Sequence, residues 1–215
     1  MFLASRSPVT GCQVLSFPIL ASANAAIAEE MPGSVPLCKL CHGESGPSPF
    51  AGVPTIHGLP EFVIANALED FRNGLRPCRK SECSRRGSCP DMSMCDVVRP
   101  LGHEEVEALA GWFSRQPFAD HRDGFDPDLA ERGRKLHESQ CEICHTRYGA
   151  DPVDEASMLR GQRKAYLRTA LEDFRQGRRS VLPAMDAKLR ALTESDLDAL
   201  AEFYSGAATG LAPPD

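Results

Sequence analysis

The chain of 215 residues has few aromatic side chains, no net positive charge and no long apolar run. Aromatic residues make up 7% of it, so small domains would need a further source of apolar core. The formal net charge of −6 argues against a nucleic acid as partner. No segment shows a convincing strand pattern, and we therefore expect an all-α fold.

The N-terminal region is apolar over only a short distance. Residues 14–28 are too few, and too broken by Pro18 and Asn24, to span a membrane. They end in Ala26-Ile27-Ala28, a pattern at which signal peptides are cleaved. We interpret residues 1–28 as a signal peptide that is removed near Ala28 on export to the periplasm. The alternative is a buried first helix of the mature fold.

Two copies of a CxxCH motif carry most of the chemistry of the sequence. This spacing attaches a c-type haem, because two thiols on one turn of helix reach the two vinyl groups of one porphyrin and the imidazole then faces the iron. The motif residues are Cys38, Cys41 and His42 in the first copy and Cys141, Cys144 and His145 in the second. A structural zinc site or a thioredoxin-like redox pair would also use CxxC. The histidine after both pairs favours two haem c groups, which would also supply apolar core.

The two motifs belong to a longer internal repeat. Ala67–Arg72 recurs unchanged as Ala170–Arg175, 103 positions later, and the motif cysteines have the same spacing. Leu109-Ala110 matches Leu200-Ala201 at a spacing of only 91, so the first half contains 12 more residues than the second. We interpret the chain as a tandem duplication with one haem in each domain. The predicted parts are a first domain at 29–116 with a cysteine-rich insertion at 77–95, a linker at 117–126, and a second domain at 127–215.

Apolar periodicity predicts two main helices after each motif. They are expected at about 61–74 and 103–115 in the first half, and at about 163–177 and 194–205 in the second. A short opening helix should deliver each motif. In the second half Gly133 would let this helix approach the final one closely, whereas Pro32-Gly33 interrupts the first half, whose opening helix should be shorter or begin later.

A six-coordinate haem iron needs a second axial ligand, and a methionine sulfur raises its reduction potential. Met185 follows the second motif, and the spacing of 91 places Met94 opposite it in the first half. We favour Met94 over its near neighbour Met92, and Met185 over Met158. Core filling is the ordinary use of a methionine, but two of them at equivalent places favour ligation.

The loop after each motif should also support the histidine that follows it. In such domains a loop carbonyl commonly accepts the ring N–H of the proximal histidine. We expect Pro54 to do this for His42, while the equivalent position in the second half is Ser157. The other histidines, which are weaker candidates for a haem ligand, are interpreted as surface or loop residues; they are His57, His103, His121 and His137.

The insertion in the first half contains four cysteines around Met94, namely Cys78, Cys83, Cys89 and Cys95. In an exported protein we expect two disulfides that hold a long loop, in any of three pairings. A soft-metal site for copper or zinc is the alternative. The basic residues of the insertion favour a solvated loop over a docking patch for an acidic partner.

These residues resemble class I cytochromes c in tandem, as in the cytochrome c4 group, and more closely the dihaem subunit of flavocytochrome c sulfide dehydrogenase. The second half carries most of the likeness, in Phe125-Asp126, Leu129-Ala130, Gly133, Lys135-Leu136-His137, Cys141-Glu142, Cys144-His145, Gly149, Leu159, Gly161-Gln162, Tyr166-Leu167, Asp173-Phe174-Arg175, Met185 and Ala187-Lys188-Leu189-Arg190. In the first half it rests on Cys38, Cys41-His42-Gly43, Phe71, Gly74, Met94 and Ala110-Gly111-Trp112-Phe113. The likeness covers nearly all of 34–206, but the cysteine-rich insertion departs from it.

The resemblance implies a dihaem electron carrier without catalytic residues of its own. A separate FAD-containing flavoprotein subunit would oxidise sulfide, and electrons would pass singly through two haems to a small soluble acceptor. Nothing in spacing or composition indicates sulfide chemistry. A free cytochrome c4-like carrier to a terminal oxidase is the alternative, followed by a dihaem enzyme, which the methionine in each half disfavours.

Overall fold

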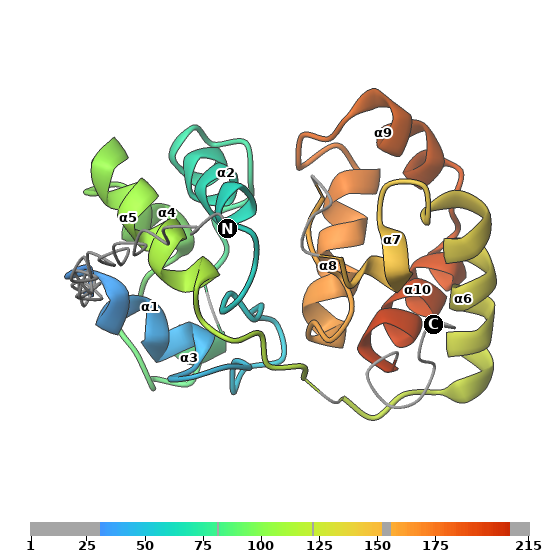
Figure 1. The fold of residues 1–215 in the computed structure, drawn as a ribbon, viewed down its shortest axis with the longest axis horizontal. Helices are drawn as coiled ribbons and strands as arrows, with labels where there is room; N and C mark the ends of the chain where they lie inside the picture. The colour runs from blue at the N-terminus through green and yellow to red at the C-terminus, as the bar shows by residue number, and fades with distance from the viewer. Residues whose placement is uncertain (1–30, 81, 122, 152–155, 207–215) are drawn as a thin grey trace, which may run out of the picture. The chain divides into compact units, whose positions relative to one another are not determined.

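The structure is a computed structural model that describes residues 31–80, 82–121, 123–151 and 156–206. The interpreted signal peptide at 1–28 lies outside these ranges. The described residues form helices joined by loops, with one isolated bridge between Lys80 and Ser93 and no strand (Figure 1). The helices are α1 (Val35–His42), α2 (Glu61–Arg72), α3 (Glu82–Arg85), α4 (Met94–Val98), α5 (His103–Ser114), α6 (Pro127–Gln140), α7 (Thr146–Gly149), α8 (Lys164–Arg175), α9 (Pro183–Arg190) and α10 (Glu194–Gly206). The all-α prediction is confirmed.

The internal repeat reappears in the backbone. Helices α2 and α8 each have 12 residues, and their bounds are 103 positions apart. Each is followed by a glycine with left-handed φ, +69° at Gly74 and +68° at Gly177. These glycines end the helices because residues with a Cβ rarely adopt that conformation. The next amide then bonds back to the helix at 2.8 Å in both halves.

The final helices repeat as closely as the middle ones. Helix α5 begins at His103 and α10 at Glu194, which is the predicted spacing of 91. Each final helix accepts a hydrogen bond from a loop glycine of its own half. The bonds are Gly58 N to Phe113 O, 2.9 Å, and Gly161 N to Tyr204 O, 3.0 Å. The 12 additional residues therefore lie between α2 and α5, where the insertion contains α3.

Each half has its own apolar core. The first core is built around α2, α4 and α5 and has as buried members Val35, Leu59, Ile64, Val98, Leu101, Val106, Leu109, Ala110, Phe113 and Met158. The second is built around α8, α9 and α10 from Leu167, Leu171, Leu189, Leu192, Leu197, Leu200, Ala201, Phe203 and Tyr204. Met158 is the exception to this division, because it follows the second motif but packs in the first core.

The opening helices differ in the predicted way. Helix α1 has 8 residues and α6 has 14, with Asp126 capping the start of α6. A Cβ built on Gly133 would lie 2.1 Å from the carbonyl oxygen of Ala199. Only glycine permits this approach of α6 to α10, so the role predicted for Gly133 is confirmed.

Candidate haem sites

The first motif lies within a helix, as expected. Cys38, Cys41 and His42 are on α1, and the His42 side chain is buried, with 6% of the residue exposed. Its Nδ1 is 2.8 Å from the carbonyl oxygen of Pro54. A carbonyl can only accept, so Nδ1 carries the proton and Nε2 keeps the lone pair that a metal needs. The prediction for Pro54 is confirmed.

Burial also sets the protonation state of the first histidine. Removal of His42 from water lowers its pKa to about 4, against the smaller opposing effect of the Pro54 carbonyl. The imidazole is therefore neutral at physiological pH, as metal ligation requires.

The second motif is presented differently. Helix α6 ends at Gln140, and Cys141 to His145 form a turn after it instead of a further turn of helix. Cys141 is the C-cap of α6 and its amide bonds to the carbonyl of His137 at 2.7 Å. Cys144 is exposed, whereas the equivalent Cys41 is half-buried. The expectation of a motif on one turn of helix therefore holds for the first site only, and the role of Ser157 stays a prediction.

A cluster of buried polar side chains contacts the second motif. His137 is fully buried, with Nδ1 2.8 Å from the Tyr204 hydroxyl and Nε2 bonded to the Glu142 carboxylate. The carboxylate accepts from Nε2, so Nδ1 accepts from the Tyr204 O–H. Glu142 lies inside the motif and also accepts from the Arg147 amide at 2.9 Å. The ring of His137 packs on Phe203 and Tyr148 as well.

The interpretation of His137 as a surface or loop residue is therefore wrong. Burial of its imidazole lowers its pKa, although the Glu142 carboxylate opposes this effect. The signal was present in the sequence, because Ala130, Gly133 and His137 recur at helical spacing on one face of α6. All three are buried.

His57 is also buried, with 2% of the residue exposed, so that interpretation is wrong as well. Its ring makes edge contacts with Trp112 and Phe113 of α5. His103 is exposed, and His121 pairs with Asp123 in the linker, as a surface or loop residue would.

The four candidate methionines differ in where they pack. Met94 begins α4 and packs half-buried against the first core, and Met185 packs against the second core from α9. Met92 is half-buried within the insertion. Met158 is 8% exposed and belongs to the first core, which favours Met185 for the second haem.

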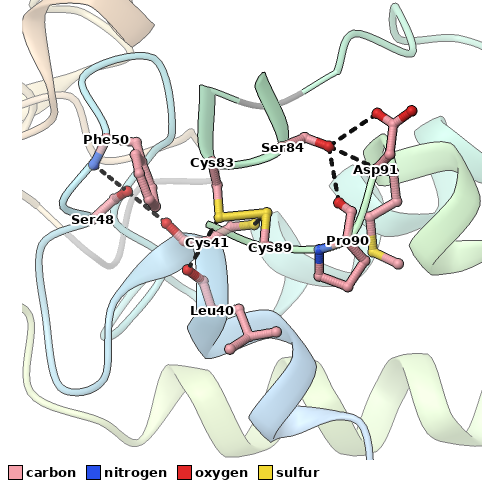
Figure 2. Close-up of a disulfide and its surroundings, with 10 residues drawn as sticks. Leu40, Cys41, Ser48, Phe50, Cys83, Ser84, Cys89, Pro90 and Asp91 are labelled. Atoms are coloured by element: carbon pink, nitrogen blue, oxygen red, sulfur yellow. Dashed lines mark hydrogen bonds between the residues drawn. A yellow bond between two sulfur atoms is a disulfide. The ribbon is translucent and has the colours of Figure 1, made fainter. Parts of the chain in front are cut away.

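The cysteines of the insertion form two disulfides, Cys78–Cys95 and Cys83–Cys89. This agrees with the favoured interpretation and selects one of its three pairings. Figure 2 shows the second disulfide lying against Cys41 of α1. The Sγ atoms of Cys41 and Cys89 are 3.7 Å apart. The insertion therefore covers the first motif on the Cys41 side.

Residues after the two motifs also bond to one another across the halves. Gln162 accepts from the Thr55 amide at 3.0 Å and donates to the Thr55 carbonyl at 2.7 Å. Arg79 of the insertion forms a two-pronged ion pair with Asp173 at 2.5 and 2.6 Å. Both contacts involve buried partners, since Gln162 is 2% and Asp173 3% exposed.

None of the helices in the described part of the chain is long and apolar enough to cross a membrane.

Comparison with known proteins identifies the class. No family profile matches the chain. It is 30% identical to cytochrome c4 of Stutzerimonas stutzeri over 210 residues, which cover 90% of this chain and 95% of that protein. It is 26% identical to the thiosulfate dehydrogenase electron acceptor of Thiomonas intermedia strain K12, covering 78% of this chain and 77% of that one.

A solved structure agrees with the sequence comparisons. Reduced cytochrome c4 from Pseudomonas stutzeri superposes with a TM-score of 0.66 at 28% identity, over 81% of this chain and 95% of the other. These relatives support the broader resemblance to cytochrome c4 and not the narrower one to a sulfide dehydrogenase subunit. The chain belongs to the cytochrome c4 family of electron-transfer proteins, which carry two covalently bound haem c groups.

Proposed function

We propose that each half of the chain, 29–116 and 127–215, is one haem domain with a histidine and a methionine as axial ligands. The first haem is bound covalently by Cys38 and Cys41 and ligated by His42 and Met94; the second is bound by Cys141 and Cys144 and ligated by His145 and Met185. The donor set fits the group, because the Nδ1 proton of His42 is held by Pro54 and its Nε2 is left for iron. A haem with these ligands supplies a one-electron site of raised reduction potential.

The protein's own residues would hold and orient the groups that bind each haem. His42 stays neutral and oriented by the Pro54 carbonyl, and the His137 cluster holds the second motif against α10. The two proposed methionine ligands would fill the positions that an enzyme would need to leave open for its substrate. These features support a carrier, and two c haems per chain in a pyridine haemochrome assay are the expected result.

We infer that the donor is a periplasmic dehydrogenase that oxidises an inorganic sulfur compound, and that a small soluble protein accepts the electrons. Support comes from the likeness of the second half to a sulfide dehydrogenase subunit and from the relative named as a thiosulfate dehydrogenase electron acceptor. The specific donor proposed is the FAD-containing flavoprotein of a sulfide dehydrogenase. Export by the signal peptide at 1–28 would place the chain in the periplasm with it.

A free carrier that feeds a terminal oxidase is the second candidate, favoured by the relatives named cytochrome c4. The two functions differ in the partner and not in the haem sites. Ferric protein mixed with sulfide and the purified flavoprotein should be reduced within the turnover time of that enzyme, and sulfide alone should act more slowly. A monodisperse, flavin-free cytochrome from the native source that the flavoprotein cannot reduce would overturn the first proposal in favour of the second.

A carbon monoxide titration tests the carrier function itself. Because methionine is proposed to fill the sixth position of each iron, neither ferrous haem should bind carbon monoxide readily at neutral pH. Ready binding by either haem would contradict the carrier function and favour an enzyme.

A further inference from the structure

Three sulfur atoms meet beside the first haem motif. The Sγ atoms of Cys41, Cys83 and Cys89 all lie within 4.8 Å of one another, and Cys41 Sγ is 3.7 Å from Cys89 Sγ. Figure 2 shows the Cys83–Cys89 disulfide across the end of α1, with Cys41 directly behind it. Cys41 is the proposed attachment point of the first haem, so its sulfur would be part of the electronic path to the porphyrin.

The two disulfides of the insertion are not equivalent. Cys78–Cys95 joins residues 17 apart and ties the start of the insertion to α4, which contains Cys95, as expected of a structural bridge. Cys83–Cys89 joins residues only 6 apart in sequence, and loop closure stabilises least when the loop is short. Its position against Cys41 therefore calls for a reason other than loop closure.

We propose that Cys83–Cys89 is a redox-active disulfide through which thiol reductants deliver electrons to the haem on Cys41. This inference rests on the proposed attachment of the first haem to Cys41. The substrate class is a dithiol, either small or at the surface of a protein.

The surroundings of the pair suit exchange with an external thiol. Cys89 is partly exposed, whereas Cys83 is only 1% exposed. An incoming thiolate therefore attacks Cys89, and Cys83 leaves. The Cys83 sulfur lies 3.8 Å from the carbonyl oxygen of Leu40, which can accept a weak hydrogen bond from the thiol once the disulfide opens.

The reaction balances in two stages. A donor thiolate attacks Cys89 and forms a mixed disulfide, and the second donor thiol attacks that bond, which releases the donor as a disulfide and leaves Cys83 and Cys89 as thiols. The two thiols then form their disulfide again, lose two protons and give two electrons, one to each of the two ferric haems of the chain. The net change is one dithiol oxidised to a disulfide, two ferric haems reduced and two protons released.

The direction follows from reduction potentials. Protein disulfides have low reduction potentials, and methionine ligation raises the potential of a c-type haem above theirs. Electrons therefore pass from the dithiol to the haems and not in reverse. Sulfur-to-sulfur contact at 3.7 Å gives the electrons a short path to the first haem.

The test compares the two disulfides as matched controls. Holoprotein is reduced with excess dithiothreitol and desalted without oxygen. Excess ferric mitochondrial cytochrome c is then added, the electrons released per chain are counted from its absorbance, and free thiols are trapped with iodoacetamide and located by peptide mass.

A Cys78→Ser/Cys95→Ser variant, which keeps the Cys83–Cys89 pair, should release four electrons per chain and leave no alkylated cysteine at 83 or 89. A Cys83→Ser/Cys89→Ser variant, which keeps the other pair, should release only two and leave Cys78 and Cys95 alkylated. Dithiothreitol should also reduce the ferric haems of the second variant roughly tenfold more slowly than those of the first.

The wild-type chain gives the same answer if a variant loses its haem, because alkylation after haem oxidation should spare Cys83 and Cys89 but not Cys78 and Cys95. Two outcomes would contradict the redox-active disulfide without affecting the haem attachment. One is equal protection of both cysteine pairs from alkylation. The other is a chain with two haems in which Cys83 and Cys89 are still alkylated. A pyridine haemochrome count of one haem per chain overturns instead the attachment on which it rests.

Discussion

The two halves of the chain hold the same motif by different means. In the first half the motif is part of a short helix, the Pro54 carbonyl fixes His42, and a disulfide-bonded insertion covers Cys41. In the second half it follows a long helix, and the side-chain cluster of His137 supports it while Cys144 stays exposed. A duplicated domain can therefore keep its cofactor motif and exchange the surrounding support. The first site has the shorter helix and the disulfide cross-links, and the second has the longer helix.

The largest effect is expected from the sixth ligands, where the halves should be equal. Met185→Ala should abolish the low-spin, methionine-ligated absorption of the second haem while leaving the haem attached, and Met94→Ala should do the same for the first. The matched controls are Met158→Ala and Met92→Ala, which remove nearby methionines and should retain both signatures. A wild-type spectrum in Met94→Ala together with a loss in Met92→Ala would exchange their roles.

The next effect should be confined to the second half. Gly133→Ala places a Cβ against the Ala199 carbonyl and forces α6 away from α10, at a cost of about 3 kcal/mol. Denaturant unfolding followed at each haem should show the second domain destabilised and the first unchanged. Gly124→Ala is the control, because no atom lies within 4 Å of its added Cβ. Equal stability of the two variants would contradict the close helix crossing.

A smaller effect tests the buried support of the second motif. His137→Phe keeps an aromatic ring but removes one hydrogen bond from the Tyr204 hydroxyl and one from the Glu142 carboxylate, which should cost the second domain about 2 kcal/mol. Adding Tyr204→Phe, which matches Phe113 of the first half, should recover part of this loss. Failure of the double variant to recover stability would show that ring packing, and not the hydrogen bonds, is what His137 contributes.

The same histidine predicts a pH dependence. Burial lowers the pKa of His137 below its ordinary value near 6.5, so the folded chain binds fewer protons than the unfolded chain around that pH. The second domain should therefore have its full stability from this group above about pH 6.5 and lose it as the pH falls further. In unfolding titrations, the stabilities of wild type and His137→Phe should differ by a constant amount above this pH, and the difference should shrink as the pH falls below it. Curves that stay parallel below about pH 6.5 would contradict a neutral buried imidazole.

Local pattern allowed much of this to be predicted from the sequence. Repeat spacing and apolar periodicity predicted the paired helices, the shorter α1 and the close approach at Gly133. The burial of His57 and the disulfide pairing were not predictable, because both depend on which segments meet in space. The polarity of His137 favours a surface position, but its place on the same face of α6 as Ala130 and Gly133 determines its burial. The turn that follows α6 could not be predicted, because the same CxxCH motif is helical in α1.

The smallest predicted effect tests whether the ends of the two repeated helices contribute equally to the free energy of unfolding. Gly74→Ala and Gly177→Ala each force a residue with a Cβ into φ near +69° or +68° at the end of α2 or α8. Neither added Cβ would meet an atom within 4 Å, so the cost is conformational alone, about 1 kcal/mol in each domain. Denaturant unfolding of both variants should give equal losses, with Gly52→Ala as an open control that lacks positive φ. Gly74 is close in sequence to the insertion. A clearly larger loss of stability in Gly74→Ala would mean that the disulfide-bonded loop depends on where α2 ends. The two halves would then differ in their middle helices as well as in their motifs.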